Sequence, residues 1–111
     1  MLNNPQFATS DPDTIEFEPF AHAVDAGEVA VVDVREPHEY AAGHIPDSVN
    51  LPMSRFDLDE LPSGKPVVLI CQAGGRSRKA LNEARASGHV DVKHYAGGMN
   101  GWRMRGGEVA F

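Results

Sequence analysis

The sequence offers little that could build a disulfide, a cysteine-rich metal site or a membrane span. Only one of its 111 residues is a cysteine, Cys71, which excludes an internal disulfide, a Cys-x-x-Cys redox pair and a thiolate-rich zinc site. No apolar run approaches the roughly 20 residues of a transmembrane helix. The first residues, MLNNPQFATSDPD, lack the basic patch and apolar core of a secretion signal. These absences predict a cytoplasmic protein without membrane partners, because a free thiol suits a reducing compartment.

Basic residues are scarce in the first half of the chain. The net charge is −6, which argues against a nucleic-acid partner. Residues 1–60 hold 13 acidic and 2 basic side chains, whereas residues 61–111 hold 3 acidic and 8 basic ones. Cys71 lies in the basic part. If the basic side chains gather around the turn after Cys71, their field would attract small anions.

The chain is long enough for one domain with its own core. Hydrophobic residues make up 41% of it and charged residues 23%, which is typical of a globular protein. Residues 1–13 are polar and lack periodicity, so we expect a flexible N-terminal tail followed by a domain over residues 14–111.

Short β-branched runs alternate with helical patterns along most of the sequence. This alternation predicts an α/β domain with a central, mostly parallel sheet and helices on both faces. We expect one or two helical turns in residues 53–61. Strands are expected in residues 14–17, 28–34, 48–52, 66–70 and 91–95, and helices in residues 18–27, 36–43, 76–87 and 97–107.

Cys71 stands where the apolar run PVVLI ends and a glycine turn leads into a helix. Ligands of parallel α/β sheets bind beyond the carboxyl ends of the strands. Gly74 and Gly75 permit a tight turn whose amides converge, and the following helix start also favours an anion. A free cysteine has a pKa of about 8.5, and converging amides with the guanidinium of Arg76 would favour its thiolate.

Each candidate residue also has a plainer interpretation. A lone cysteine at a strand end is often a small buried hydrophobe, but the coincidence of glycines, arginine and helix start favours a reactive thiol. Ser77 could donate a hydrogen bond to the sulfur or cap the helix. Asp33 and Arg35 could form an ion pair that supports the strand end. We expect His44 to make a structural hydrogen bond in a turn.

The remaining histidines and the C-terminal aromatic cluster carry weaker signals. The other histidines show no ligand spacing, so no metal site is expected. We expect Trp102, Met99 and Met104 to pack in the core beneath the turn, the alternative being a substrate pocket. The histidines without ligand spacing are His22, His38, His89 and His94.

Three stretches give the sequence a resemblance to a rhodanese domain, the fold of the thiosulfate and mercaptopyruvate sulfurtransferases. They are VVDVREPHEYAAGHIPDSVNLP (residues 31–52), VVLICQAGGRS (67–77) and YAGGMNGWRMRGGEV (95–109). The resemblance spans about residues 14–111. It implies that Cys71 takes a sulfane sulfur from a small anionic donor such as thiosulfate and passes it from a persulfide to cyanide, a thiol or a partner protein. It implies no metal and no organic cofactor.

In this resemblance, the residues after the cysteine form a cradle for the persulfide or substrate anion. They are Gln72, Ala73, Gly74, Gly75 and Arg76, with Ser77 beside them. Ala73 is uncharged where some thiosulfate-using relatives carry a cation, so a sulfur-relay or binding module with little turnover on small donors is an alternative. A phosphatase or arsenate reductase of related fold is a third, but those have a longer Cys-x5-Arg loop.

Overall fold

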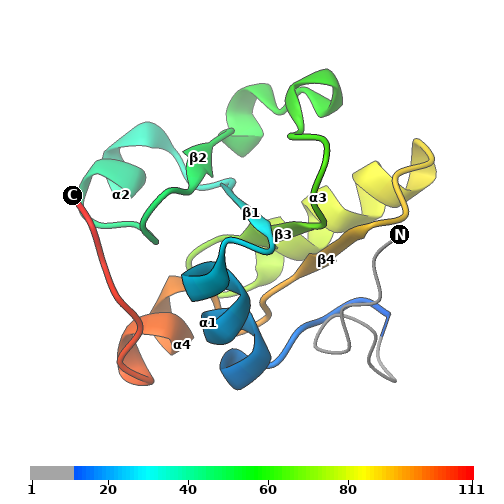
Figure 1. Ribbon diagram of the computed structural model, residues 1–111. Coiled ribbons are helices and arrows are strands. Elements are labelled where there is room, and N and C mark those ends of the chain that lie inside the picture. Colours follow the sequence, from blue (N-terminus) through cyan, green and yellow to red (C-terminus); the bar gives the residue numbers. More distant parts are fainter. Residues whose placement is uncertain (1–11) are drawn as a thin grey trace.

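The computed structural model describes residues 12–111 and has a parallel sheet at its centre (Figure 1). Its strands are β1 (Ala30–Asp33), β2 (Val49–Asn50), β3 (Val67–Ile70) and β4 (Val92–His94). They lie in the order β2-β1-β3-β4, and each neighbouring pair is parallel. The predicted α/β class is therefore confirmed.

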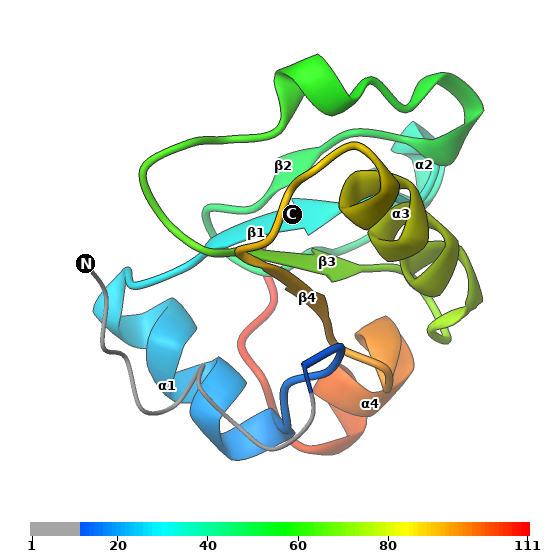
Figure 2. The same cartoon turned by 90° about the vertical axis from the view of Figure 1, so that its right-hand side faces the viewer.

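Helices cover both faces of this sheet. The α-helices are α1 (Phe17–Ala26), α2 (Pro37–Ala41), α3 (Gly75–Ala86) and α4 (Gly98–Met104), and two short 3-10 turns follow β2 at Met53–Arg55 and Leu58–Glu60. Figure 2 shows α1 and α4 below the sheet, with α3 and the segment of the 3-10 turns above it. The expected helices on both faces are thus present.

The alternation of side chains along each strand divides the core into two clusters. Val31, Val68 and Ile70 belong to the cluster beneath α1 and α4. Leu69 and Cys71 belong to the cluster beneath α3. Because of this alternation, the cysteine side chain lies on the sheet face that is covered by the helix it leads into.

Helix boundaries follow the proline and glycine signals, whereas the first expected strand does not form. Gly27 ends α1 in the left-handed conformation, with φ of 68°, and Pro37 is the first residue of α2. The strand expected in residues 14–17 is wrong: Thr14 makes an isolated parallel bridge with His94, and Phe17 already begins α1. The segment is too short and too close to a helix start to extend the sheet.

Most of the expected N-terminal tail, residues 1–13, lies outside the described residues. Only Pro12 and Asp13 belong to it and are described. The Asp13 carboxylate pairs with Arg78 at 3.0 Å and Arg85 at 2.6 Å, both on α3.

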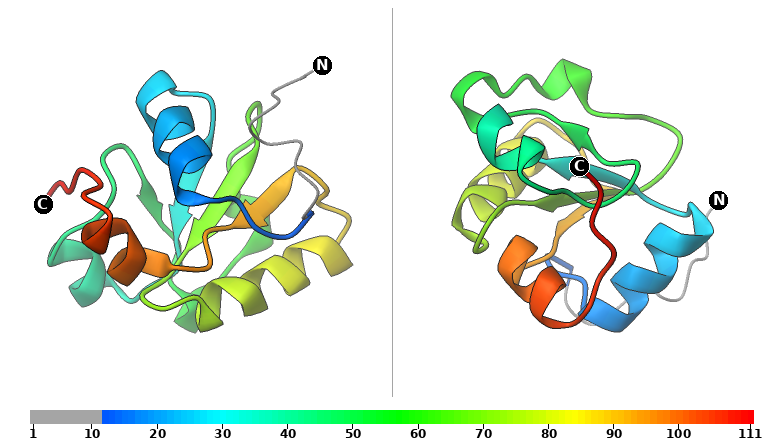
Figure 3. Two further views of the ribbon diagram at one scale, coloured as in Figure 1. Left: turned by 90° about the horizontal axis from the view of Figure 1, so that it is seen from below. Right: turned by 90° about the vertical axis from the view of Figure 1, so that its left-hand side faces the viewer.

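The C-terminal segment runs from α4 back to α2 (Figure 3, right). The His44 amide donates to the Ala110 carbonyl at 2.9 Å, and the Ala110 amide donates back at 2.8 Å. The indole of Trp102 donates to the Glu108 carbonyl at 2.8 Å. Within residues 12–111, no helix is long and apolar enough to cross a membrane.

Candidate active site

The candidate site lies where the carboxyl ends of the two central strands meet. From β1 the chain continues to β2 on one side, and from β3 it continues to β4 on the other. The strand order therefore reverses between β1 and β3, which is the position where parallel sheets of this type bind ligands. Asp33 ends β1, and Cys71 directly follows β3.

The loop after Cys71 wraps main-chain amides around the sulfur. The Gly74 amide donates to Sγ at 3.0 Å, and the Ser77 amide donates to it at 3.3 Å. Gly74 has a φ of 104°, which favours glycine, and caps the start of α3. The cysteine is only 1% exposed, so the sulfur lies at the floor of a loop whose exposed residues include Ala73 and Gly75.

Two opposing effects set the pKa of the Cys71 thiol. Burial, the largest single influence, raises it. A hydrogen bond with the Ser77 side chain and hydrogen bonds from the amides of Ser77, Gly74 and Ala73 lower it and together outweigh burial, so the pKa lies below its ordinary value. The arrangement therefore favours a nucleophilic thiolate.

Asp33 and Arg35 form a buried ion pair beside this loop. The guanidinium donates to the Asp33 carboxylate through Nε at 3.0 Å and through NH2 at 2.7 Å. Their side chains are 0% and 3% exposed. The remaining donors of Arg35 reach the Gly43 carbonyl at 2.8 Å and Gln72 Oε1 at 3.1 Å. This arginine thus joins the end of β1 to the cradle.

Helix α4 packs directly against the back of the cradle. The Met99 amide donates to the Cys71 carbonyl at 2.8 Å, and the Asn100 amide donates to the Gln72 carbonyl at 3.1 Å. The Gln72 side chain also donates to Asn100 Oδ1 at 2.6 Å. Gly98 has a φ of 63°, and a Cβ there would overlap the Gln72 carbonyl oxygen. The glycine is what allows this close approach.

Arg76 is held by a carboxylate from another helix. Its NH1 donates to Glu39 Oε1 at 2.7 Å and its NH2 to Oε2 at 3.0 Å. This bidentate bond to Arg76 lowers the pKa of Glu39 to about 2. The Glu36 amide also donates to Glu39 Oε1 at 2.9 Å, which fixes the carboxylate on α2. Arg76 is therefore at the cradle, but its charge is balanced.

Ser77 contacts both the sulfur and a histidine. Its Oγ lies 3.5 Å from Cys71 Sγ, 3.2 Å from the Gly74 carbonyl oxygen and 2.8 Å from His94 Nδ1. Ser77 and His94 are 0% and 3% exposed. The contact with the sulfur expected from the sequence thus has a geometric counterpart. The alternative role as a helix cap does not, because Gly74 is the N-cap of α3 and no side chain caps this helix.

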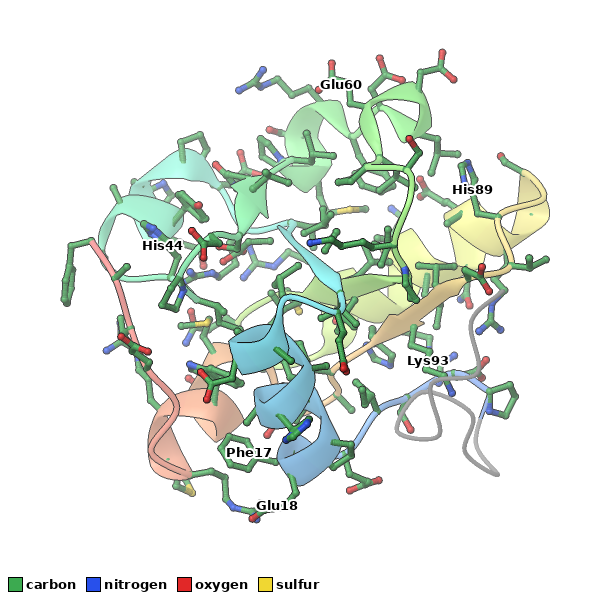
Figure 4. The ribbon with its side chains drawn as sticks, viewed as in Figure 1. Phe17, Glu18, His44, Glu60, His89 and Lys93 are labelled. Carbon is green, nitrogen blue, oxygen red and sulfur yellow. The ribbon has the colours of Figure 1, made fainter. Side chains whose placement is uncertain are left out.

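The other candidates lie outside the cradle. His44 Nδ1 lies 2.9 Å from the Tyr40 carbonyl oxygen, and the two rings stack at 3.9 Å, as a structural histidine would. Figure 4 shows His44 and His89 on opposite sides of the molecule. Among the described residues, no three His, Cys, Asp or Glu side chains are grouped so that they could hold a metal ion.

The aromatic cluster is in the core, with one exception. Trp102 and Met99 are 2% and 0% exposed beneath α1. Met104 is 84% exposed, so its predicted packing with the other two is wrong. It is the last residue of α4, at the exposed end of this short helix.

Sequence reasoning missed Glu39, His94 and Asn100. Each is far from Cys71 in the chain and reaches the loop only through the fold: Glu39 through Arg76, His94 through Ser77 and Asn100 through Gln72. Nothing in the sequence around His94 marks it. Glu39 lies in the stretch at residues 31–52, which pointed to a family resemblance but not to a contact with Arg76. Asn100 lies in the glycine-rich stretch at residues 95–109, which pointed to a family resemblance but not to a contact.

Comparisons with known proteins bear on the family and the fold of this chain. The family model of the rhodanese-like domain matches residues 17–105. A thiosulfate:glutathione sulfurtransferase of Saccharomyces cerevisiae is 36% identical over 95 residues, covering 72% of this chain and 68% of that protein. An uncharacterized protein of Synechocystis is 42% identical over 80 residues, covering 70% of this chain and 45% of that protein, so this chain spans less than half of its length.

A solved structure has the same fold. The human single-domain sulfurtransferase TSTD1 superimposes with a TM-score of 0.73 and 26% sequence identity, covering 86% of this chain and 98% of that one. This chain belongs to the rhodanese-like domain family.

Proposed function

We propose that the protein is a sulfurtransferase that carries a sulfane sulfur as a persulfide on Cys71. One observation carries the proposal: the sulfur of the only cysteine accepts hydrogen bonds from the amides of Gly74 and Ser77 at the start of α3. Such donors stabilise negative charge on sulfur, whether it is a thiolate or the outer atom of a persulfide.

In the first half-reaction, the Cys71 thiolate attacks the outer sulfur of a donor such as thiosulfate. A bond forms between the two sulfurs, the donor's S–S bond breaks, and sulfite leaves with the electron pair. In the second, the thiolate of an acceptor attacks the outer sulfur of the Cys71 persulfide. The cysteine leaves as a thiolate, so the site returns to its starting state without any net redox change.

The name of the yeast relative makes thiosulfate and glutathione the first donor and acceptor to test. Ala73 supplies no charge, and Glu39 already balances Arg76. Attraction of a dianion by the cradle is therefore weak. These two features favour a second candidate, a relay module that receives sulfur from a partner protein and turns over small donors slowly.

The proposal is tested by mixing the protein with thiosulfate and measuring its intact mass. We expect the mass of one added sulfur atom on the wild-type chain, its loss on addition of glutathione, and neither change with Cys71→Ala. Full transfer by Cys71→Ala would refute the proposal. Sulfur loading without turnover of small donors would identify the relay module instead.

An assay of aryl phosphate hydrolysis tests the third alternative, a phosphatase. Only four residues separate Cys71 from Arg76, so we expect no turnover, because the shorter loop does not surround a tetrahedral phosphate. Turnover that depends on Cys71 would favour the phosphatase.

A further inference from the structure

Ser77 has one hydroxyl hydrogen and three neighbours within reach. The neighbours are Cys71 Sγ at 3.5 Å, the Gly74 carbonyl oxygen at 3.2 Å and His94 Nδ1 at 2.8 Å. A thiolate and a carbonyl can only accept, whereas an imidazole nitrogen can donate or accept. The shortest contact is therefore also the one whose direction is open.

The direction of that hydrogen bond decides whether the hydroxyl hydrogen or a lone pair of Ser77 Oγ faces the sulfur. If Nδ1 accepts from Ser77, the hydrogen points away from the sulfur, and the thiolate faces an oxygen lone pair. If Nδ1 carries a hydrogen and donates it, the Ser77 hydrogen is released to the acceptors on its other side. The Gly74 carbonyl already accepts from the Arg78 amide at 3.0 Å, which leaves the anionic sulfur as the stronger acceptor.

The fold holds the three groups on one face of the sheet. His94 pairs with the strand that leads to Cys71, in register with Leu69. Val92, two residues before His94, belongs to the same cluster as Cys71, so His94 also lies on the α3 side. Both the histidine and the serine are buried, so neither can turn to solvent without repacking.

We propose that His94 is a positioning residue: its Nδ1–H donates to Ser77 Oγ and thereby directs the single Ser77 hydroxyl hydrogen to the Cys71 sulfur. That this hydrogen bond contributes to sulfur transfer rests on the proposed function above. The contact itself acts on the free thiolate, so it can be measured without any sulfur donor.

Other charges around the sulfur must stay constant in such a measurement. Arg76 on α3 is within electrostatic reach of both Cys71 and Asp33, and Glu39 on α2 is within reach of Arg76 and Arg35. Helix α4 contributes the uncharged Asn100 to the loop. Substitution of His94 changes none of these side chains.

The test is the pH profile of alkylation of Cys71 by iodoacetamide, a neutral reagent that reacts with the thiolate. We expect His94→Leu to slow alkylation about tenfold below the thiol pKa, the size of one charge-assisted hydrogen bond. His94→Asn, whose amide can donate from nearly the same place, should restore most of the rate. The control is His89→Leu, which removes an exposed histidine and should leave the pH profile unchanged.

A double substitution distinguishes a positioning role of His94 from a general loss of structure. In a Ser77→Ala background, His94→Leu should cause no further loss, because the hydrogen it directs is gone. An unchanged profile for His94→Leu, or an equal loss in both backgrounds, would overturn the proposal. Failure of sulfur transfer with an intact alkylation effect would instead count against the proposed function alone.

The wild-type protein provides a second measurement that needs no folded variant. NMR chemical shifts of the imidazole nitrogens report which one carries the hydrogen. We expect His94 Nδ1 to be protonated, in either the neutral or the charged ring. A neutral ring protonated only at Nε2 would overturn the proposal even if every variant failed to fold.

Discussion

Asp33 and Arg35 form a buried ion pair that supports the loop through Gln72. Arg35 is 3% exposed, and its donors are shared among Asp33, Gly43 and Gln72. A buried ion pair adds little net stability compared with an apolar pair, but removal of one partner leaves an uncompensated charge. We therefore infer that the pair fixes the position of Gln72 more than it strengthens the fold.

Asp33→Ala should lower the free energy of unfolding by about 3–5 kcal/mol, since it strands the buried guanidinium. Chemical denaturation at neutral pH measures this. The matched control is Glu18→Ala, which breaks an exposed pair with Arg105 at 3.7 Å. Figure 4 shows Glu18 on the outer side of α1. Its loss should change stability by less than about 1 kcal/mol, and equal effects of the two substitutions would contradict our account.

Residue types and their order along the chain predicted the amide contacts around Cys71 within its own loop, but not the side chains that reach this loop from elsewhere in the fold. Cys71, Gly74 and Ser77 are close in the chain, and their contacts follow from one local loop. The contacts of His94 and Glu39 need the strand order and the packing of α2, which no local pattern contains. Pairing of β4 with β3 is what places His94 beside Ser77.

The packing of α4 on the cradle makes this helix part of the site. Its first amides bond the carbonyls of Cys71 and Gln72, so the loop is held between α3 in front and α4 behind. Gly98 is the point of closest approach. The hydrogen bonds from α4 therefore help to hold the loop in the conformation in which its amides point toward the sulfur.

Gly98→Ala should destabilise the protein by more than the cost of the left-handed backbone and should reduce alkylation of Cys71. Gly27→Ala is the matched control, because its φ of 68° is similar to the 63° of Gly98 and nothing lies near its Cβ. We expect the control to lose about 1 kcal/mol of stability and to keep a normal thiol. Thermal unfolding and iodoacetamide kinetics give both quantities; similar results for the two variants would show that the contact is unimportant.

Elements with a strong apolar run and a clear stop were predicted well from the sequence. The run PVVLI contains β3, and Gly88, with φ of 95°, lies directly after the cap of α3. The expected strand at residues 14–17 failed because the same residues lead into α1, whose first residue Phe17 packs on Trp102 at 5.5 Å. Packing on a helix outweighed the alternating pattern.

Ion pairs across the protein join its acidic first part to its basic second part. Arg76, Arg78 and Arg85 pair with Glu39 or Asp13, and Arg105 pairs with Glu18. The attraction of small anions, which the sequence suggested if basic side chains gather after Cys71, is therefore reduced for these arginines because each is paired with a carboxylate. The uneven distribution of acidic and basic residues along the sequence thus provides ion pairs between distant segments.

One of these pairs should make stability depend on acidity. The pKa of Glu39 is lowered from its ordinary value of 4.5 to about 2, so its ionised form stabilises the folded state fully above pH 4.5, and this contribution is lost as the pH falls toward 2. Glu39→Gln should therefore cost about 1–2 kcal/mol at neutral pH, allowing for partial solvent screening.

Urea unfolding of wild type and Glu39→Gln at several pH values measures this dependence. The difference between the two proteins should shrink steadily as the solution is acidified from pH 5 toward pH 2. A difference that is constant over this range would mean that the carboxylate contributes by packing and not by its charge.

The chain contains a single cysteine, and under the proposed function that has a consequence for how a bound sulfur would be released. Many thiol enzymes discharge through a resolving cysteine of their own, which attacks the modified sulfur and closes a disulfide. Cys71 has no such neighbour within this sequence, so under the proposed function a persulfide sulfur would leave Cys71 only when an outside nucleophile enters the loop. The rate of sulfur release would then depend on the concentration of that nucleophile and on how well it fits the loop. The persulfide form of the protein would persist until such a nucleophile binds.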